Sequence, residues 1–485
     1  MSVDKRLNLY GQRLRLQRER PDGHPQHEQQ AEEEYAYDDV FPRVPDLTRQ
    51  PLNDVGNAER FLVTFFGEVR YCPELRAWFV WDKRRWRQDN GAAEYLAKRA
   101  MREFRHQAVD MFYQPELLKF AVQSSNVAKY RYLLQAAQSE PGIPVRLSEL
   151  DCHPFLLNVR NGTIDLETGE LGRHRREDLL TQFIDVNYDP KAQAPLWNTV
   201  LLEALGPENV SYLQKVLGYS LSADTAEKAI FILFGKKDAG KSTLLSVIRG
   251  LLGDYATLLM VQTLTSHTRG SNALADLADL QGKRFAQTSE LGDEKLVQRV
   301  LKSCVQGAGS EIKAVRKYAN PIRFRETAKI FIDTNDLPPM SDPYDEAFLS
   351  RVHLIYCAKS VPPEKIDRKL LEKLTAEFPG ILAWLVEGFR HYRAEGLQKP
   401  PSMVDAINGW VANSDNVRRF ILEACLVDAR YSVQPEPFYK GYMAWCRHSH
   451  EKPVALSVFC QRLARRGFRR SRRHDGRSYG GIRLA

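Results

Sequence analysis

The chain has 485 residues, a length that favours two to four domains over a single core. Its 70 Lys and Arg residues against 61 Asp and Glu give a net charge of +9, which favours a polyanionic partner. No apolar run approaches about 18 residues and the N-terminus is rich in Arg and Gln, so the sequence predicts neither a membrane span nor a signal peptide.

The seven cysteines are scattered along the chain, with no C-x-x-C pair and no histidine at zinc spacing. This pattern argues against a structural zinc site or a disulfide framework. It is typical of thiols in a reducing cytoplasm, so we expect a soluble, intracellular protein.

The first two segments differ in composition. Residues 1–48 are polar and unpatterned, which predicts a disordered tail. Residues 49–190 have a globular composition and are interpreted as an N-terminal α+β module. Its expected elements are short strands around Trp78, Trp81 and Trp86 with a turn at Asp82-Lys83, helices over about 92–111 and before Gly142, and a hairpin at Asn161-Gly162.

Two helical segments flank the central part of the chain. Apolar residues at helical spacing predict two short helices over 191–226, a collar or linker between domains or subunits. The central core is expected over 227–360. A further helical segment follows over 361–412.

A glycine-rich loop opens the central core. Residues 229–234 form an unbroken apolar run, typical of a strand buried on both faces, and residues 243–252 show helical spacing. Strand, loop and helix in this order predict a site whose backbone N–H groups face the phosphates of ATP. Lys241 is expected to reach the β- and γ-phosphates, and Ser242 to ligate Mg²⁺. The loop consists of Gly235, Lys236, Lys237, Asp238, Ala239, Gly240, Lys241 and Ser242, with Thr243 following.

Three later residues are candidates for the chemistry of ATP hydrolysis. Glu290 ends a weak strand and is predicted to activate water or hold Mg²⁺. Asn335 follows the strand 329–334 and is expected to contact the γ-phosphate and its attacking water. Arg351 precedes a further strand and is interpreted as an arginine that one subunit inserts into its neighbour's site.

Two basic segments are candidates for DNA contact. Alternating apolar residues over 312–325 flank a Tyr-Ala-Asn-Pro turn, which predicts a basic β-hairpin able to grip a nucleic-acid backbone. The end of the chain, 413–485, is interpreted as a winged-helix domain, since nine Arg and one acid follow Ser457. The predicted DNA-binding residues are Lys313, Arg316, Lys317, Arg323, Arg462, Arg466, Arg470 and Arg473.

The order of these motifs resembles superfamily 3 helicases. More narrowly, it is similar to the helicase half of phage- and plasmid-encoded primase-helicases of the poxvirus type. Residues 54–61, 161–166 and 213–219 resemble segments of the same family, so that the resemblance covers about residues 50–485. The hairpin departs from it, because a Gly-Gly-Asp run often precedes the hairpin in relatives and is absent here.

The resemblance implies an α/β fold with a modified AAA+ P-loop ATPase core, an N-terminal α+β module and a C-terminal winged helix. It further implies a hexameric ring with ATP sites between subunits, and 3′-to-5′ unwinding of DNA in a bacterial host cytoplasm. Lys241, Ser242, Glu290, Asn335 and Arg351 take the roles described above.

We therefore expect an ATP-dependent replicative DNA helicase of a phage, plasmid or other mobile element. Its expected partners are single- and double-stranded DNA, including the replication origin. The alternative is a DNA-binding initiator or switch whose ATPase controls assembly without unwinding. A primase domain in the same chain is not expected, because about fifty disordered residues precede the N-terminal module. A primase would be encoded separately.

Overall fold

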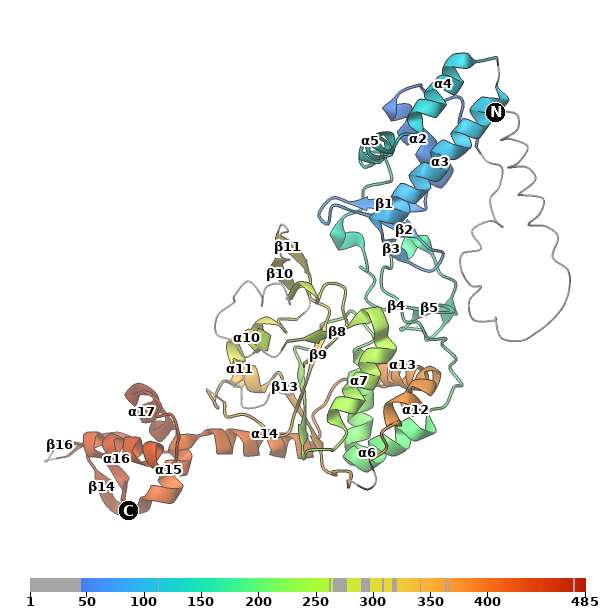
Figure 1. The fold of residues 1–485 in the computed structure, drawn as a ribbon. Helices are drawn as coiled ribbons and strands as arrows, with labels where there is room; N and C mark the ends of the chain where they lie inside the picture. The colour runs from blue at the N-terminus through green and yellow to red at the C-terminus, as the bar shows by residue number, and fades with distance from the viewer. Residues whose placement is uncertain are drawn as a thin grey trace.

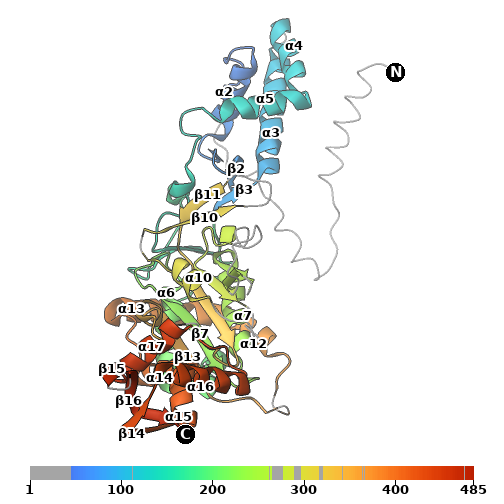
Figure 2. The ribbon, with the colours of Figure 1, turned by 90° about the vertical axis from the view of Figure 1, so that its left-hand side faces the viewer.

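The computed structural model describes residues 45–485 apart from 112, 261–262, 265–276, 289–296, 308, 316–320, 341, 363, 365 and 474–475. Figures 1 and 2 show three bodies in sequence: an N-terminal module, a central sheet with its helices, and a C-terminal domain at the end of a long helix. None of the helices in the described ranges is long and apolar enough to cross a membrane.

The N-terminal module packs helices against a three-stranded antiparallel sheet. Asn53 caps helix α2 by accepting from the Gly56 N–H at 2.8 Å, and Asp89 caps the long helix α3 by accepting from the Ala92 N–H at 2.9 Å. The predicted strands and turn around Trp78–Trp86 are present. The elements are α2 (Asp54–Phe65), β1 (Val69–Cys72), β2 (Ala77–Trp81), β3 (Trp86–Gln88), α3 (Asn90–Asp110), α4 (Pro115–Ser124) and α5 (Val127–Ala137).

A second small sheet links this module to the core. The predicted hairpin at Asn161-Gly162 joins β4 to β5, with Val159 opposite Gly162. Gly162 has φ +156°, and a Cβ there would lie 2.2 Å from the carbonyl oxygen of Gly172, so this crossing requires glycine. The elements are η1 (Leu147–Glu149), β4 (Leu156–Val159), β5 (Gly162–Asp165), β6 (Leu171–Gly172) and η2 (Arg176–Asp178).

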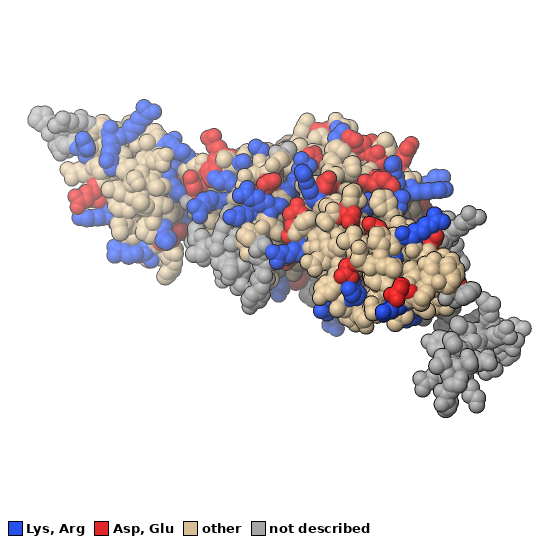
Figure 3. Space-filling model, turned by 90° about the horizontal axis from the view of Figure 1, so that it is seen from above, with Lys and Arg blue, Asp and Glu red and all other residues tan. Residues whose placement is uncertain are grey.

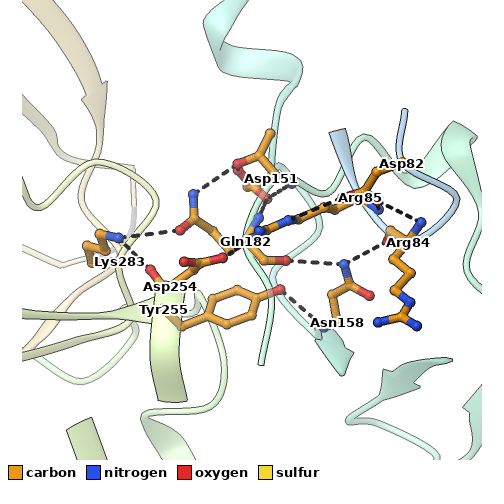
Figure 4. A network of polar contacts seen from close by, with 10 residues as sticks. Asp82, Arg84, Arg85, Asp151, Asn158, Gln182, Asp254, Tyr255 and Lys283 are labelled. Carbon is orange, nitrogen blue, oxygen red and sulfur yellow. Dashed lines mark hydrogen bonds and ion pairs between the residues drawn. The ribbon is translucent and has the colours of Figure 1, made fainter. Parts of the chain in front are cut away.

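Polar contacts hold the N-terminal module against the core (Figure 4). Arg85 pairs with Asp254, which lies in the short 3-10 turn η3 (Gly253–Tyr255) of the core. The Asn158 N–H donates to the Tyr255 hydroxyl at 3.1 Å, and the Asn158 amide donates to the Arg84 carbonyl at 2.9 Å. These contacts join residues far apart in the sequence, so the module and core form a continuous body at this point.

The core is a five-stranded parallel sheet in the order β13-β7-β12-β9-β8. Strand β7, which lies between β13 and β12, is buried over Ile230–Leu233, in agreement with the unbroken apolar run of the sequence. The strands are β7 (Ile230–Gly235), β8 (Ala256–Leu259), β9 (Phe285–Thr288), β12 (Lys329–Thr334) and β13 (Val352–Cys357). The helices and turn around them are α7 (Lys241–Leu252), η3 (Gly253–Tyr255), α10 (Gln298–Ser303) and α11 (Glu346–Leu349).

Two long helices from either side of the core pack tightly together. α6 (Pro195–Tyr219) is kinked at Gly206, where φ is 75° and ψ 165°, so it consists of the two shorter helices that the sequence predicts. It lies against α13 (Phe378–Glu395), which follows α12 (Leu370–Ala376). A Cβ at Gly218 would lie 2.2 Å from the Phe389 nitrogen, so glycine permits this close approach.

The C-terminal domain has its own apolar core and a three-stranded sheet in the order β14-β16-β15. α14 (Pro401–Ser414) runs from the central body to this domain (Figure 1). The helix expected from Leu456 is present as α17. The elements are α15 (Asn416–Ala424), β14 (Cys425–Val433), α16 (Pro435–His448), α17 (Leu456–Arg465), β15 (Arg470–Arg473) and β16 (Gly476–Leu484).

Two arginines of the predicted DNA surface are placed differently from that expectation. Arg462 is 4% exposed and pairs with Asp415 at 3.3 Å, and Arg466 also contacts Asp415. The Tyr344 hydroxyl donates to the same carboxylate at 2.6 Å. The buried guanidinium of Arg462 cannot contact a phosphate without breaking its pair, and the half-buried Arg466 is held by the same carboxylate, so both arginines instead join the C-terminal domain to the core.

Removing the central carboxylate should destabilise this junction strongly. Asp415→Ala would leave Arg462 buried without its partner, a change that typically costs about 3–5 kcal/mol. Equilibrium denaturant unfolding of the full chain measures it. The matched control is Asp428→Ala, whose pair with Arg430 is exposed and should contribute less than about 1 kcal/mol. Equal effects of the two substitutions would contradict the junction.

Candidate nucleotide site and basic hairpin

The glycine-rich loop connects the end of β7 to the start of α7. Gly235 has φ +140°, and a Cβ there would lie 2.2 Å from the Cys357 carbonyl oxygen, so glycine lets the loop leave the sheet beside β13. Gly240 has φ 76° and precedes the first residue of α7. The first turn of α7 thus faces the loop with unsatisfied backbone N–H groups, which is an arrangement that favours anions.

Lys241 lies at the centre of this arrangement. Its ammonium group donates to the carbonyl oxygens of Gly235 and Lys236, each at 2.8 Å, and to the Asn335 Oδ1 at 3.0 Å. The side chain is 6% exposed. The structure therefore brings together Lys241 and Asn335, which are 94 residues apart in the chain.

Lys241 and Asn335 lie together because the strands that precede them, β7 and β12, are neighbours in the sheet. β12 pairs with β7 in parallel, with Thr334 opposite Phe234, so both strands end at the same edge of the sheet. The Gly235 N–H also donates to the Asn335 carbonyl at 3.3 Å. The amide side chain after β12 consequently lies next to the loop after β7.

Asp333 is a further residue of the site, and the sequence analysis missed it. The Ser242 hydroxyl donates to its carboxylate, which is 2% exposed. The signal was present, because Asp333 and Asn335 are two residues apart and such residues project to the same face of a strand.

A cavity of about 260 Å³ lies over the loop. A second space of about 730 Å³ adjoins it and is bordered by Lys237 and Asn335 as well as by Phe234, Tyr356 and Trp410. Together they offer the room that a nucleotide needs. The cavity over the loop is lined by Lys237, Asp238, Ala239, Gly240, Lys241, Ser242, Thr243, Asp333, Thr334 and Asn335.

Glu290 lies outside the described residues, so its predicted role in water activation stays a prediction. The strand before it, β9, is described to Thr288 and pairs with β12. One strand therefore separates β9 from the loop strand β7.

Arg351 lies at the opposite edge of the sheet from the loop. Val352 is paired with Ile230, the first residue of β7, whereas Cys357 is paired with Gly235. At about 3.3 Å per residue, Arg351 is roughly 17–20 Å from the loop of its own chain, beyond the reach of its side chain. Its guanidinium donates to the Ala347 carbonyl.

The basic hairpin is present as β10 (Glu311–Val315) and β11 (Pro321–Arg325). Lys313 and Arg323 are exposed and stand directly opposite each other. Like charges in this position destabilise a hairpin, unless an anion lies between them. Arg316 and Lys317, also predicted to contact DNA, lie outside the described residues.

The hairpin lies close to the N-terminal module (Figure 2). A cavity of about 800 Å³ is lined by Arg85 and Arg87 from that module and by Arg323 and Arg325 from β11. Acidic side chains, among them Glu311, border the same space. Sequence reasoning did not foresee that the module and the hairpin share a cavity.

Glu326 directly follows the hairpin and is buried at 3% exposure. Burial raises the pKa of its carboxyl to about 7, although the Gln306 N–H and the Ser310 hydroxyl donate to it at 3.3 and 3.1 Å. The carboxyl is therefore protonated more readily in the folded than in the unfolded chain.

This shift predicts a pH-dependent stability. A raised folded-state pKa contributes stability that is present below about pH 4.5 and is lost as the pH rises through about 7. Glu326→Gln should therefore stabilise the chain at pH 8 relative to wild type, by about 3 kcal/mol, and leave it nearly unchanged near pH 4. Urea unfolding at both pH values measures this. The matched control is Glu311→Gln, which replaces an exposed carboxylate of the same hairpin.

The C-terminal domain carries further cations. On the face seen in Figure 3, blue side chains predominate over red ones on this domain, which lies at the left. Arg470 donates to the Tyr479 hydroxyl at 2.9 Å and to the Cys460 sulfur at 2.8 Å, so its guanidinium is positioned at the surface. The side chain of Arg473 lies outside the described part.

Comparisons with known proteins identify two families within the chain. Residues 58–206 match the family described as "D5 N terminal like". Residues 233–351, which include the loop, Asn335 and Arg351, match a family of unknown function, DUF5906. Each match covers less than half of the chain.

Two viral proteins named as putative helicases are similar to the chain. One, from Acanthamoeba polyphaga mimivirus, is 26% identical over 281 residues, which are 53% of this chain and 29% of that protein. The other, from Sputnik virophage, is 25% identical over 197 residues, which are 37% of this chain and 25% of that protein. The chain thus spans less than a third of either relative.

Solved structures of the NrS-1 C-terminal region are also similar in part. One apo structure is 12% identical with a TM-score of 0.45, covering 84% of this chain and 85% of that one. A second is 11% identical with a TM-score of 0.43, covering 73% and 74%. With TM-scores below 0.5, the similarity of these folds is only partial.

Proposed function

We propose that this chain is an ATP-dependent DNA helicase that serves the replication of a virus, phage, plasmid or other mobile element. The observation that carries the proposal is the loop between β7 and α7, where the Lys241 ammonium lies 3.0 Å from Asn335 Oδ1. A lysine and an amide at one sheet edge, beside a helix N-terminus, suit a nucleoside triphosphate. The putative-helicase names of the viral relatives agree with this chemistry.

The residues around the loop suit both ATP and Mg²⁺. Lys241 would exchange its contacts with the loop carbonyls for the β- and γ-phosphates, and Asn335 would orient the attacking water. The Ser242 hydroxyl and the Asp333 carboxylate supply oxygen donors, the ligand type that Mg²⁺ takes. Bound Mg²⁺ would neutralise the charge that develops on the phosphates. Glu290 is proposed to activate the water.

The site is incomplete within one chain if Arg351 takes part in hydrolysis. Since Arg351 lies at the far edge of its own sheet, a neighbouring copy must supply it. Repetition of this head-to-tail contact forms a ring when the rotation between neighbouring copies closes, and we propose such a ring here. A hexamer and 3′-to-5′ polarity follow only from the resemblance to superfamily 3 helicases with a modified AAA+ core.

DNA contact is proposed at two places. The exposed, opposed Lys313 and Arg323 of the hairpin would grip a single-stranded backbone, which relieves their mutual repulsion. The C-terminal domain, with helix α17 before the β15–β16 pair, is proposed as a winged helix that contacts duplex DNA through Arg470 and neighbouring cations. A separately encoded primase remains a proposed partner.

Strand displacement on forked DNA tests the proposal. Wild type should unwind the fork with ATP and Mg²⁺, and Lys313→Ala/Arg323→Ala should lower unwinding at least about tenfold while retaining hydrolysis, because it removes phosphate contacts only. The matched control is Arg105→Ala/Lys119→Ala, which removes two exposed cations of the N-terminal module.

Each alternative has its own outcome. Hydrolysis and duplex binding without displacement, on forks of either polarity, would contradict the helicase and favour the initiator or switch. Equal loss of unwinding in the control variant would show that net charge, and not the hairpin, matters.

A further inference from the structure

The deepest acid of the nucleotide cavity is Asp333, a residue for which the sequence suggested no role. Its carboxylate lines the cavity together with Lys241, Ser242 and Thr243 and is 2% exposed. Burying a carboxylate is costly, unless hydrogen bonds or a cation compensate for the lost water. An acid at this depth inside a phosphate-binding cavity therefore calls for an explanation.

The contact with Ser242 supplies one. The hydroxyl donates its proton to the Asp333 carboxylate. The lone pairs of Ser242 are then free to face the cavity, where the hydroxyl is expected to meet Mg²⁺. The Asp333 carboxylate, which accepts from this hydroxyl, therefore lies next to the position expected for Mg²⁺.

The strand position makes this placement rigid. Asp333 lies in β12, which is paired on one side with β7 and on the other with β9, and it stands opposite Leu233. It is therefore held within the sheet, by its own pairing with β7 and by the pairing of the preceding residues, up to Ile332, with β9. Among the residues described at the end of β9, Phe285–Thr288, none is a carboxylate. Within the described part of the cavity, Asp333 is the buried acid beside Ser242, whereas Asp238 is exposed.

We propose that Asp333, together with Ser242, forms the protein side of the Mg²⁺ site. This inference rests on the proposed ATP site. It divides two tasks that the sequence assigned to Glu290 alone: Asp333 holds the metal, and Glu290 is left to activate water. Mg²⁺ sites commonly use one or two carboxylates plus substrate phosphates, and the pair of oxygens here fits that pattern.

The charge of Asp333 makes a distinctive prediction. Without metal, its negative charge opposes the phosphates of ATP, whereas with Mg²⁺ it attracts the cation that bridges them. Asp333→Asn should therefore bind ATP in EDTA as tightly as wild type or more tightly. In contrast, the variant should need at least about tenfold more Mg²⁺ than wild type to reach the same Mg²⁺-dependent increase in ATP affinity. A merely structural loss would weaken binding under both conditions.

The experiment titrates a fluorescent ATP analogue onto the full chain, in EDTA and over a series of Mg²⁺ concentrations. Mn²⁺ binding in the presence of ATP, followed by electron paramagnetic resonance, gives a second readout that does not depend on turnover. Asp333→Ser repeats the test with a hydroxyl in place of the amide, in case Asp333→Asn does not fold. Asp336→Asn is the matched control, because this exposed acid lies three residues away.

The outcomes separate the two proposals. Wild type that binds no ATP overturns the proposed function. Wild type and Asp333→Asn with the same Mg²⁺ dependence overturn only the role of Asp333. Equal effects of Asp336→Asn would also overturn it, because the cause would then be general electrostatics. Loss confined to the Mg²⁺-dependent part of binding supports the assignment.

Discussion

Lys241→Ala is expected to lower ATP hydrolysis by at least about 10²–10³-fold and to weaken ATP binding, because it removes the cation that would stabilise charge on the transferred phosphate. The geometry makes this loss specific. In the free chain the ammonium is held by two loop carbonyls at 2.8 Å and by Asn335 at 3.0 Å, directly beside the first turn of α7. Phosphate release assays and nucleotide titrations measure both effects.

The matched control for this variant is Lys359→Ala. Lys359 is exposed and follows β13, one residue before Ser360, whose hydroxyl donates to the Lys237 carbonyl of the loop. The substitution removes a lysine close to the loop without touching the cavity, so hydrolysis should stay within about twofold of wild type. Full hydrolysis by Lys241→Ala would contradict the nucleotide site altogether.

Arg351→Ala is expected to abolish hydrolysis while leaving ATP binding intact. Arginines that reach a transferred phosphate across an interface contribute about 10³–10⁵-fold to the rate. Arg351 is at the amino edge of the sheet and the loop at the carboxyl edge, so its effect must come from another copy of the chain. The measurements are turnover and affinity for the fluorescent analogue. Arg368→Ala, at an exposed position, is the control.

Mixing two inactive variants tests this arrangement directly. A chain with Arg351→Ala still presents Lys241, and a chain with Lys241→Ala still presents Arg351. A mixed assembly therefore contains some intact sites, and hydrolysis should reappear at a fraction of the wild-type rate. If mixtures stay inactive although the two variants co-assemble, Arg351 does not act between subunits.

Local patterns of the sequence predicted local structure well. The apolar run 229–234, the loop and the following helical spacing became β7, the connection to α7 and α7 itself, because a buried parallel strand needs continuous apolar residues. The hairpin at 312–325 and the turn at Asn161-Gly162 followed from alternation and turn chemistry, which also act over a few residues. Asn335 was recognised because it directly follows an apolar strand.

Long-range pairing was beyond the reach of these patterns. From the sequence, Arg462 and Arg466 were predicted to belong to a basic DNA-binding surface. In the structure both contact Asp415, about 50 residues earlier in the chain. The side-chain period of α17 does not reveal which acid its arginines will meet. The contact of Asp333 with Ser242, 91 residues away in the sequence, is another such pairing, although the position of Asp333 two residues before Asn335 was visible in the chain.

The sequence by itself determined that this protein has a glycine-rich loop between a buried strand and a helix, a basic hairpin, and an arginine-rich end. Each depends on neighbouring residues whose spacing is visible in the chain. Only the tertiary structure decided which charges meet: Lys241 with Asn335, Ser242 with Asp333, Arg462 with Asp415, and Arg351 with no phosphate loop of its own chain. The reason is that strand order and packing, which no local pattern encodes, set the distances between charged side chains.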